Sequence, residues 1–236
     1  TDRLKFDGFS DKPIGEYYKD LLRMMGLRVS DEPTKIWLAD EEMGYADEFF
    51  KKEDIKDEDI VIGIAPGGGV SFGKGKLAFK RWPQDKFAEL AGIIIKETES
   101  KVIFLWGPGE EGLIKGIVNL MDRKPIVAPQ TTIGEMAALM SKCDCVVCND
   151  SGPLHVAVAI GTKTVSIFGP SDQNVYGPYP KDKRHITVTK DIECRPCYKR
   201  FKIPDCEKID CLRGLEAKEV FLAVADHIKR KRYDEK

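Results

Sequence analysis

The sequence predicts an α/β protein with a doubly wound parallel sheet. The first observation is that short apolar runs recur from Ile60 onward, each followed by a turn and most by a segment of helical character. The second is that residues 60–65 form a continuous apolar run, as in a strand buried on both faces of a parallel sheet. Glycine and proline stop several of these runs, so the strands should end at a defined edge.

Five runs are predicted to be strands: residues 60–65, 101–106, 125–128, 143–148 and 163–168. A further run, 185–189, is a candidate edge strand. Helical spacing or helix-start residues predict the helices around them. These are residues 14–25, 41–52, 83–96, 110–121, 132–141, 217–232 and the small-residue segment 156–161. Thr132 and Glu135 form a capping box, and Pro83 stands at a first-turn position.

The chain is expected to have three parts. Its 236 residues suffice for one large domain or for one domain with appendages. Residues 1–56 should form a helical lead-in segment, residues 57–215 the sheet domain with a cysteine-rich loop at 194–211, and residues 216–236 a closing helix. The chain begins without methionine, which indicates a processed protein or a piece of a longer one.

The composition excludes several classes of partner. An apolar fraction of 42% is typical of a soluble globular protein. A net charge of −1 provides no bulk attraction to nucleic acid or membranes. No apolar run approaches the roughly 18 to 20 residues that span a bilayer, and no signal peptide precedes the first helix. These features predict a cytoplasmic protein with no nucleic-acid partner and at most peripheral membrane contact.

The stretch Asn149-Asp150-Ser151-Gly152, followed by His155, is the densest group of polar residues after a predicted strand. In an open α/β sheet this edge is where ligands bind. Asp150 could bind sugar hydroxyls, and the backbone of Ser151 and Gly152 could meet a diphosphate. The alternative is that these residues only cap the helix and that His155 is a satisfied buried histidine. The density of polar groups favours a binding site.

Three more loops follow strands and should reach the same edge. Gly67, Gly68, Gly69 and Ser71 lead toward Lys80, which could hold an anion before a helix, although a flexible turn with a surface lysine is the simpler interpretation. Glu111 could hold ribose, but acidic residues also suit the first turn of a helix. Thr131 could line a base pocket beside the capping residue Thr132.

Several local motifs are absent from the sequence. The glycine spacing fits neither a P-loop nor a Gly-x-Gly-x-x-Gly fingerprint, and there is no Gly-x-Ser-x-Gly nucleophile elbow. The three histidines lie far apart in the chain, so a histidine-based metal site is poorly supported.

Four blocks of sequence carry a resemblance to a known family. They are Ile-Ala-Pro-Gly-Gly at 64–68, Lys-Arg-Trp-Pro-Gln-Asp-Lys-Phe-Ala at 80–88, Asn-Asp-Ser-Gly-Pro-Leu-His at 149–155 and Phe-Gly-Pro-Ser-Asp at 168–172. Together they resemble glycosyltransferase family nine, the ADP-heptose:lipopolysaccharide heptosyltransferases, over roughly residues 13–230. Members have two Rossmann-like domains in the GT-B arrangement, and this chain is similar to the C-terminal, donor-binding half.

The resemblance implies a role for each candidate residue. Gly67, Gly68, Gly69, Ser71 and Lys80 would bind the donor diphosphate, and Lys80 would stabilise the leaving group. Glu111 would hold ribose and Thr131 would lie near adenine. Asp150 would hold the transferred sugar, Ser151 and Gly152 would contribute backbone groups, and His155 would support their turn. The insert from Val70 to Phe79, with Lys74 and Lys76, departs from the family pattern and leaves the phosphate-loop contacts open.

The implied function is donor binding in an inverting transfer of heptose from an ADP-heptose-like nucleotide sugar to a lipopolysaccharide core acceptor. No cofactor is required. The acceptor site and base would lie on an N-terminal domain for which this chain offers no candidate, so the chain alone should be inactive. The resemblance places the reaction in the cytoplasm, at the inner face of the inner membrane. The alternative function is a non-catalytic nucleotide-sugar-binding module or subunit.

Seven cysteines fall into two groups. Cys143, Cys145 and Cys148 on or beside the central strand are expected to be small buried hydrophobes. Four late cysteines have Cys-x2-Cys-x8-Cys-x4-Cys spacing: Cys194, Cys197, Cys206 and Cys211. They could bind structural zinc, form disulfides or stay reduced. A zinc-dependent interaction module is therefore a third functional hypothesis. Whether the four thiols bind zinc, form disulfides or stay reduced, the expected role of the loop is structural.

Overall fold

The computed structural model describes residues 8–68, 78–202 and 205–234. Six parallel strands form one sheet in the order β3-β2-β1-β4-β5-β6. Their bounds are β1 Val61–Ala65, β2 Lys101–Phe104, β3 Ile126–Val127, β4 Cys145–Asn149, β5 Thr164–Phe168 and β6 His185–Thr189. The predicted doubly wound fold is confirmed, and the candidate edge strand pairs with β5.

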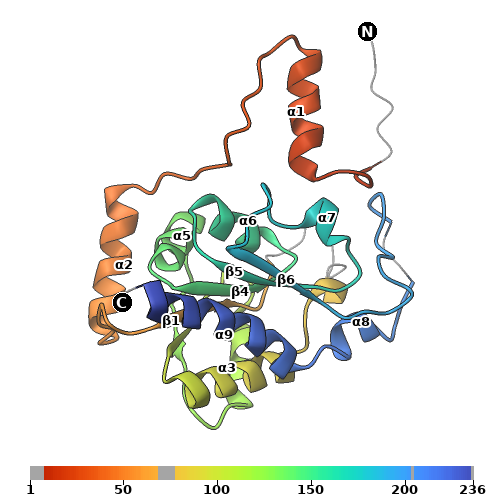
Figure 1. Ribbon diagram of the computed structural model, residues 1–236. Coiled ribbons are helices and arrows are strands. Elements are labelled where there is room, and N and C mark those ends of the chain that lie inside the picture. The colour runs from red at the N-terminus through yellow and green to blue at the C-terminus, as the bar shows by residue number, and fades with distance from the viewer. Residues whose placement is uncertain (1–7, 69–77, 203–204, 235–236) are drawn as a thin grey trace.

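Helices cover both faces of the sheet (Figure 1). Their bounds are α1 Ile14–Met24, α2 Asp40–Lys52, α3 Gln84–Thr98, α4 Glu111–Asn119, α5 Ile133–Ser141, α6 Gly152–Ala159, α7 Gln173–Tyr176, α8 Asp210–Arg213 and α9 Ala217–Asp234, with a 3-10 turn η1 at Ala78–Lys80. One face carries α3, α4 and α9, and the other carries α2, α5 and α6. Because successive strand residues point to opposite faces, Ile62 and Ile64 enter one core while Val61 and Ala65 enter the other. This two-sided burial explains the continuous apolar run.

Three short elements were not predicted from the sequence: η1, α7 and α8. Each has three or four residues, too few for a periodic pattern. Residues 35–38 belong to no strand, although the backbone N–H of Ile36 donates to the carbonyl of Ala159 at 3.1 Å. Pro83 is the N-cap of α3 rather than a residue of its first turn.

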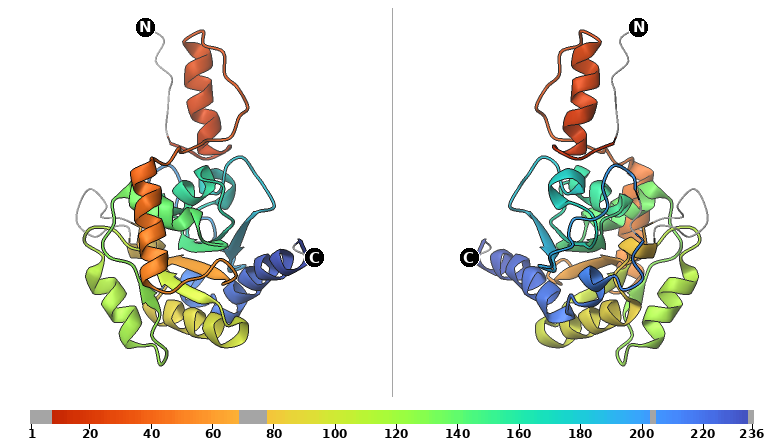
Figure 2. Two further views of the ribbon diagram at one scale, coloured as in Figure 1. Left: turned by 90° about the vertical axis from the view of Figure 1, so that its left-hand side faces the viewer. Right: turned by 90° about the vertical axis from the view of Figure 1, so that its right-hand side faces the viewer.

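The lead-in segment is largely exposed as far as α2, and α1 buries none of its residues. Helix α1 projects from the sheet domain in every view, and its first turn lies nearest to the domain (Figures 1 and 2). There Tyr179 packs against Gly15 and hydrogen-bonds Glu16. Large apolar side chains of the segment are exposed: Tyr18, Leu21, Leu22, Met24, Met25, Leu27, Ile36 and Trp37. By contrast, α2 packs on α5 through buried Ala46 and Phe49.

The sheet changes winding direction between β1 and β4. From β1 the chain proceeds outward through β2 and β3, and from β4 it proceeds outward on the other side through β5 and β6. The connections leaving β1 and β4 therefore diverge and leave a crevice at the carboxyl ends of these two strands. Ligands of doubly wound proteins bind at this position.

Candidate functional site

Asn149, the last residue of β4, joins the loops at the crevice. Its amide nitrogen donates to the carbonyls of Pro66 at 2.7 Å and Gly67 at 3.2 Å. Its amide oxygen accepts from the backbone N–H of Trp82 at 3.0 Å. The side chain is buried, with 1% of its surface exposed. One residue thus connects the loop after β1, the turn before α3 and the end of β4.

The connection at Trp82 positions Lys80 at the crevice. The indole of Trp82 is buried, donates to the carbonyl of Leu215 at 3.1 Å, and packs edge-on against Phe87. Two residues earlier, the Lys80 ammonium lies 2.7 Å from a carboxylate oxygen of Asp150. Only 13% of the lysine side chain and 6% of the aspartate side chain are exposed. The site therefore holds a largely desolvated ion pair.

Glu110 is the carboxylate that faces the loop after β1. Its two oxygens accept from the backbone N–H groups of Gly68, at 2.8 Å, and Gly107, at 3.1 Å. A Cβ added at Gly67 would lie 1.9 Å from Glu110 Oε1, so this close approach requires glycine. Glu111 lies instead on the exposed face of α4, where it pairs with Lys115 at 2.7 Å.

The N-terminus of α6 points into the site without a side-chain cap. Ser151 is the N-cap residue, but its hydroxyl donates to the carbonyl of Asn149 at 3.2 Å rather than accepting from the helix. Capping is therefore not the role of this side chain. His155 lies one turn further along. Its pKa is lowered because protein replaces water around part of the ring; Asp150 opposes this shift and Lys80 adds to it.

Two adjoining pockets lie over the crevice. The polar pocket, of about 240 Å³, is lined by Gly67, Gly68, Lys80, Arg81, Asn149, Asp150, Ser151, Gly152 and His155. The apolar pocket, of about 470 Å³, is lined by Gly68, Gly107, Pro108, Glu110, Thr131, Thr132, Ile133, Met136, Gly152, Pro153 and Val156. They share Gly68 and Gly152. A ligand with one anionic and one flat apolar part would suit this pair.

Most residues singled out in the sequence meet in these pockets. Thr131 lines the apolar one, and its hydroxyl donates to the carbonyl of Trp106 at 3.1 Å. Glu111 lines neither pocket, and Gly69 and Ser71 lie outside the described residues. Sequence reasoning missed Arg81, the joining role of Asn149, and Glu110. The Glu110-Glu111 pair itself was a signal, but spacing alone does not say which carboxylate turns inward.

The two glutamates make a matched test. We expect Glu110→Ala to lower the free energy of unfolding by about 1–3 kcal/mol, because one buried and one part-buried N–H group lose their acceptor. Glu111→Ala should change it by less than about 0.5 kcal/mol, since an exposed ion pair contributes little. Urea unfolding followed by tryptophan fluorescence measures both. Equal effects of the two substitutions would contradict the assignment of Glu110 as the inward-facing carboxylate.

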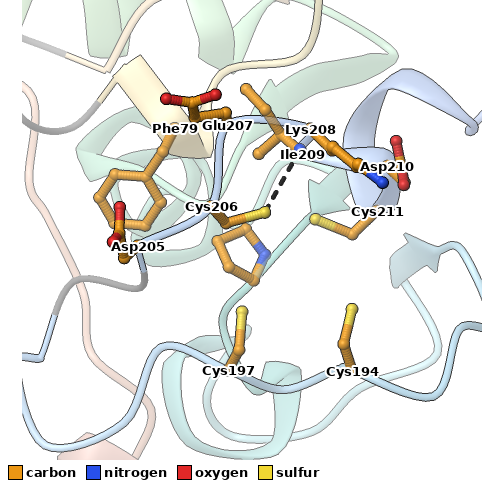
Figure 3. Close-up of a pocket in the computed structure, with 11 residues that line it drawn as sticks. Phe79, Cys194, Cys197, Asp205, Cys206, Glu207, Lys208, Ile209, Asp210 and Cys211 are labelled. Atoms are coloured by element: carbon orange, nitrogen blue, oxygen red, sulfur yellow. Dashed lines mark hydrogen bonds between the residues drawn. The ribbon is translucent and has the colours of Figure 1, made fainter.

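The four late cysteines line one hollow beside Pro170 and Phe79 (Figure 3). All are free thiols. Burial raises the pKa of Cys211 to about 11, and the neighbouring thiols of Cys197, Cys194 and Cys206 add to the shift. Among the described residues, no three Cys, His, Asp or Glu side chains are arranged to hold a metal ion, so the zinc hypothesis gains no support. Cys143, Cys145 and Cys148 are buried, as predicted.

The sequence matches the family model described as glycosyltransferase family 9 (heptosyltransferase) over residues 18–207. It is 28% identical over 170 residues to lipooligosaccharide heptosyltransferase 2 of Campylobacter jejuni, covering 70% of this chain and 51% of that protein. The chain thus spans about half the length of this curated relative.

Solved structures resemble the fold as well. A family 9 glycosyl transferase of Veillonella parvula superimposes with a TM-score of 0.77 at 27% identity, covering 94% of this chain and 61% of that one. The ADP-heptose LPS heptosyltransferase II of E. coli has a TM-score of 0.64 at 20% identity, covering 84% of this chain and 54% of that one. Because the E. coli enzyme is only 20% identical to this chain, its likeness concerns the fold alone.

Proposed function

The chain belongs to glycosyltransferase family 9, the heptosyltransferases, and we propose that it is the part of such an enzyme that binds the nucleotide-sugar donor. Its sheet has the Rossmann-like architecture of the GT-B heptosyltransferases. The observation that carries the proposal is the pair of adjoining pockets at the switch point, one polar and one apolar, which share Gly68 and Gly152. A nucleoside diphosphate sugar has the same division into an anionic and an aromatic part.

The polar pocket would take the diphosphate and the sugar. Lys80 supplies a cation, and the uncapped N-terminus of α6 at Ser151 and Gly152 supplies N–H groups and the positive end of a helix dipole. Asp150 would accept hydrogen bonds from the sugar hydroxyls once the Lys80 ammonium donates to the diphosphate instead. The loop at Gly67 and Gly68 lets the ligand approach the backbone closely. Gly69 and Ser71 are proposed as further diphosphate-binding residues.

The apolar pocket would take the base. Thr131 lies in its wall, and Ile133, Met136, Pro153 and Val156 supply apolar surface for a flat ring. Glu111, which the resemblance assigned to the ribose, lies outside both pockets on the exposed face of α4, so no residue is assigned to the ribose here. The choice of adenine is proposed from membership of the heptosyltransferase family and from the resemblance of the sequence to its ADP-heptose-dependent members.

The reaction proposed for the whole enzyme is transfer of heptose to a lipopolysaccharide core acceptor with inversion. Negative charge accumulates on the leaving diphosphate as the glycosidic bond breaks. A fixed lysine and helix amides interact more strongly with that developing charge than with the ground state, which lowers the barrier. A general base must take the proton of the attacking hydroxyl, and no residue of the two pockets is assigned this role.

The acceptor site and the base are proposed to lie in a second domain outside this chain. Supporting this, the chain spans about half of its Campylobacter relative, and the lead-in segment exposes an apolar surface on and beside α1 that suits domain packing. No described helix is long and apolar enough to cross a bilayer. We propose a cytoplasmic location at the inner face of the inner membrane, with peripheral contact at most.

A non-catalytic nucleotide-sugar-binding module or subunit is the alternative function. It would use the same pockets and need no second domain. The upstream coding sequence distinguishes the enzyme from the binding module. An open reading frame of roughly 100 to 170 further codons, the length of one domain, favours the enzyme.

We expect the chain to bind ADP, with a dissociation constant in the micromolar to millimolar range typical of substrates, and to show no sugar transfer by itself. Isothermal titration calorimetry with ADP, and with UDP as the matched nucleotide, measures the first part. Incubation with ADP-heptose and a core acceptor, followed by mass spectrometry, measures the second. Absence of ADP binding would contradict the donor-site proposal. Sugar transfer by this chain alone would contradict only the need for a second domain.

A further inference from the structure

We propose that Tyr198, assisted by Tyr176, is a positioning residue that holds the Lys80 ammonium beneath an aromatic surface, and that the cysteine-rich loop serves to place Tyr198 there. The proposal rests on the proposed function, because it assigns Lys80 to the donor diphosphate. It gives the cysteine-rich loop a structural role that requires no metal ion.

Two tyrosine rings contact the ammonium of Lys80. Its nitrogen lies 4.4 Å from the ring centre of Tyr198 and 5.0 Å from that of Tyr176. The two ring centres are 5.6 Å apart, with 52° between the ring planes. Both tyrosines are more than nine-tenths buried. The lysine therefore has two aromatic neighbours and one carboxylate, Asp150.

The rings act on Lys80 differently from the carboxylate. An aromatic face attracts a cation through its quadrupole and occupies no N–H donor in a strong hydrogen bond. Asp150 does occupy a donor, at 2.7 Å, and competes with a diphosphate for it. The rings can thus hold the ammonium in place while its donors pass from Asp150 to the ligand, and little reorganisation is needed when the donor arrives.

The cysteine-rich loop fixes Tyr198 through its own backbone. The N–H groups of Cys197 and Tyr198 both donate to the carbonyl of Pro170 at 3.0 Å. The Arg195 guanidinium donates to the carbonyl of Ser171 at 3.3 Å and to the side chain of Gln173 at 3.1 Å. The loop is therefore tied to the connection between β5 and α7, and the ring of Tyr198 does not depend on Lys80 for its position.

Tyr176 reaches the same ammonium from α7. Its hydroxyl is buried and has no hydrogen-bond partner among the described residues. Burial raises the pKa of Tyr176 to about 12, and Tyr198 and Asp150 add to that shift. The phenol therefore stays neutral at physiological pH, and its ring keeps the full attraction for the cation. The missing hydrogen bond agrees with a role for the ring of Tyr176 rather than for its hydroxyl.

The test is a double-mutant cycle read by ADP affinity. We expect Tyr198→Leu to weaken ADP binding roughly tenfold, because the cation loses its aromatic face, and Tyr198→Phe to stay within about twofold, because the ring remains. In a Lys80→Met background the effect of Tyr198→Leu should shrink to about twofold or less, since no cation is left to position. Phe49→Leu, on the buried face of α2, controls for loss of a buried ring away from the site.

A second measurement covers the case in which Tyr198→Leu does not fold. Phenylalanine, difluorophenylalanine and trifluorophenylalanine at position 198 keep the shape but withdraw electron density from the ring. ADP affinity should fall with each step when Lys80 is present and stay level when it is methionine. Equal effects in both backgrounds, or a loss in Tyr198→Phe as large as in Tyr198→Leu, overturn the proposal. If Lys80→Met itself leaves ADP binding unchanged, the proposed function fails instead.

Discussion

Lys80→Met should weaken ADP binding by about 10- to 100-fold and also destabilise the protein. The affinity falls because a charge-assisted hydrogen bond to the diphosphate, with a net contribution of about 1.5–3 kcal/mol, is lost. The stability falls because Asp150, 8% exposed, keeps its carboxylate without its cation, and breaking a buried pair costs about 3–5 kcal/mol. Calorimetry with ADP and urea unfolding measure the two effects separately.

The double variant Lys80→Met/Asp150→Asn separates binding from folding. Removing the second charge leaves a neutral amide in place of an unpaired carboxylate, so most of the stability should return. The ADP affinity should stay low, because the cation is still missing. If the double variant recovers affinity together with stability, Lys80 acts only through folding and its assignment to the diphosphate is wrong.

The architecture could be predicted from the sequence because it depends on local patterns. A run such as residues 60–65, buried on both sides, is apolar throughout, and the glycine and proline turns mark where strands stop. The chain order of strands and helices then implied a doubly wound sheet, whose switch point lies where the candidate loops follow β1 and β4. The positions of Gly67, Gly68, Lys80, Asp150, Ser151 and Gly152 in one pocket follow from this topology.

The details that the sequence did not reveal are contacts between distant residues. Lys80 and Asp150 are 70 positions apart, and each has other plausible partners. Glu110 and Glu111 differ only in which side of the turn they face, which depends on how α4 packs. Tyr198 belongs to the cysteine-rich loop, where the cysteine spacing pointed to metal binding or disulfides. It is the tyrosine of this loop that contacts Lys80 in the site. Such pairings are set by packing in three dimensions and leave no periodic pattern in the chain.

Asn149→Leu should be among the most destabilising single substitutions in the described chain. Leucine is of similar size but cannot hydrogen-bond, so the N–H of Trp82 and the carbonyls of Pro66 and Gly67 lose their partner inside the protein. At about 1–3 kcal/mol for each unsatisfied group, we expect a loss of about 3 kcal/mol or more. The melting temperature should fall by roughly 6–12 °C. The exposed Asn119, changed to leucine, is the matched control on α4.

Asn149→Asp tests whether the donated hydrogen bonds matter as well as the accepted one. The carboxylate can still accept from Trp82, but its second oxygen would face two carbonyl oxygens. The folded state should therefore raise the pKa of this carboxyl above its ordinary value of about 3.9. A group with a raised folded-state pKa favours folding when it is protonated, so the stability deficit against the parent should be largest at pH 7 and smaller at pH 5. A stability deficit that does not depend on pH would show that the amide donor of Asn149 does not hold these loops together. Another residue would then have to connect the loop after β1, the turn at Lys80 and the end of β4.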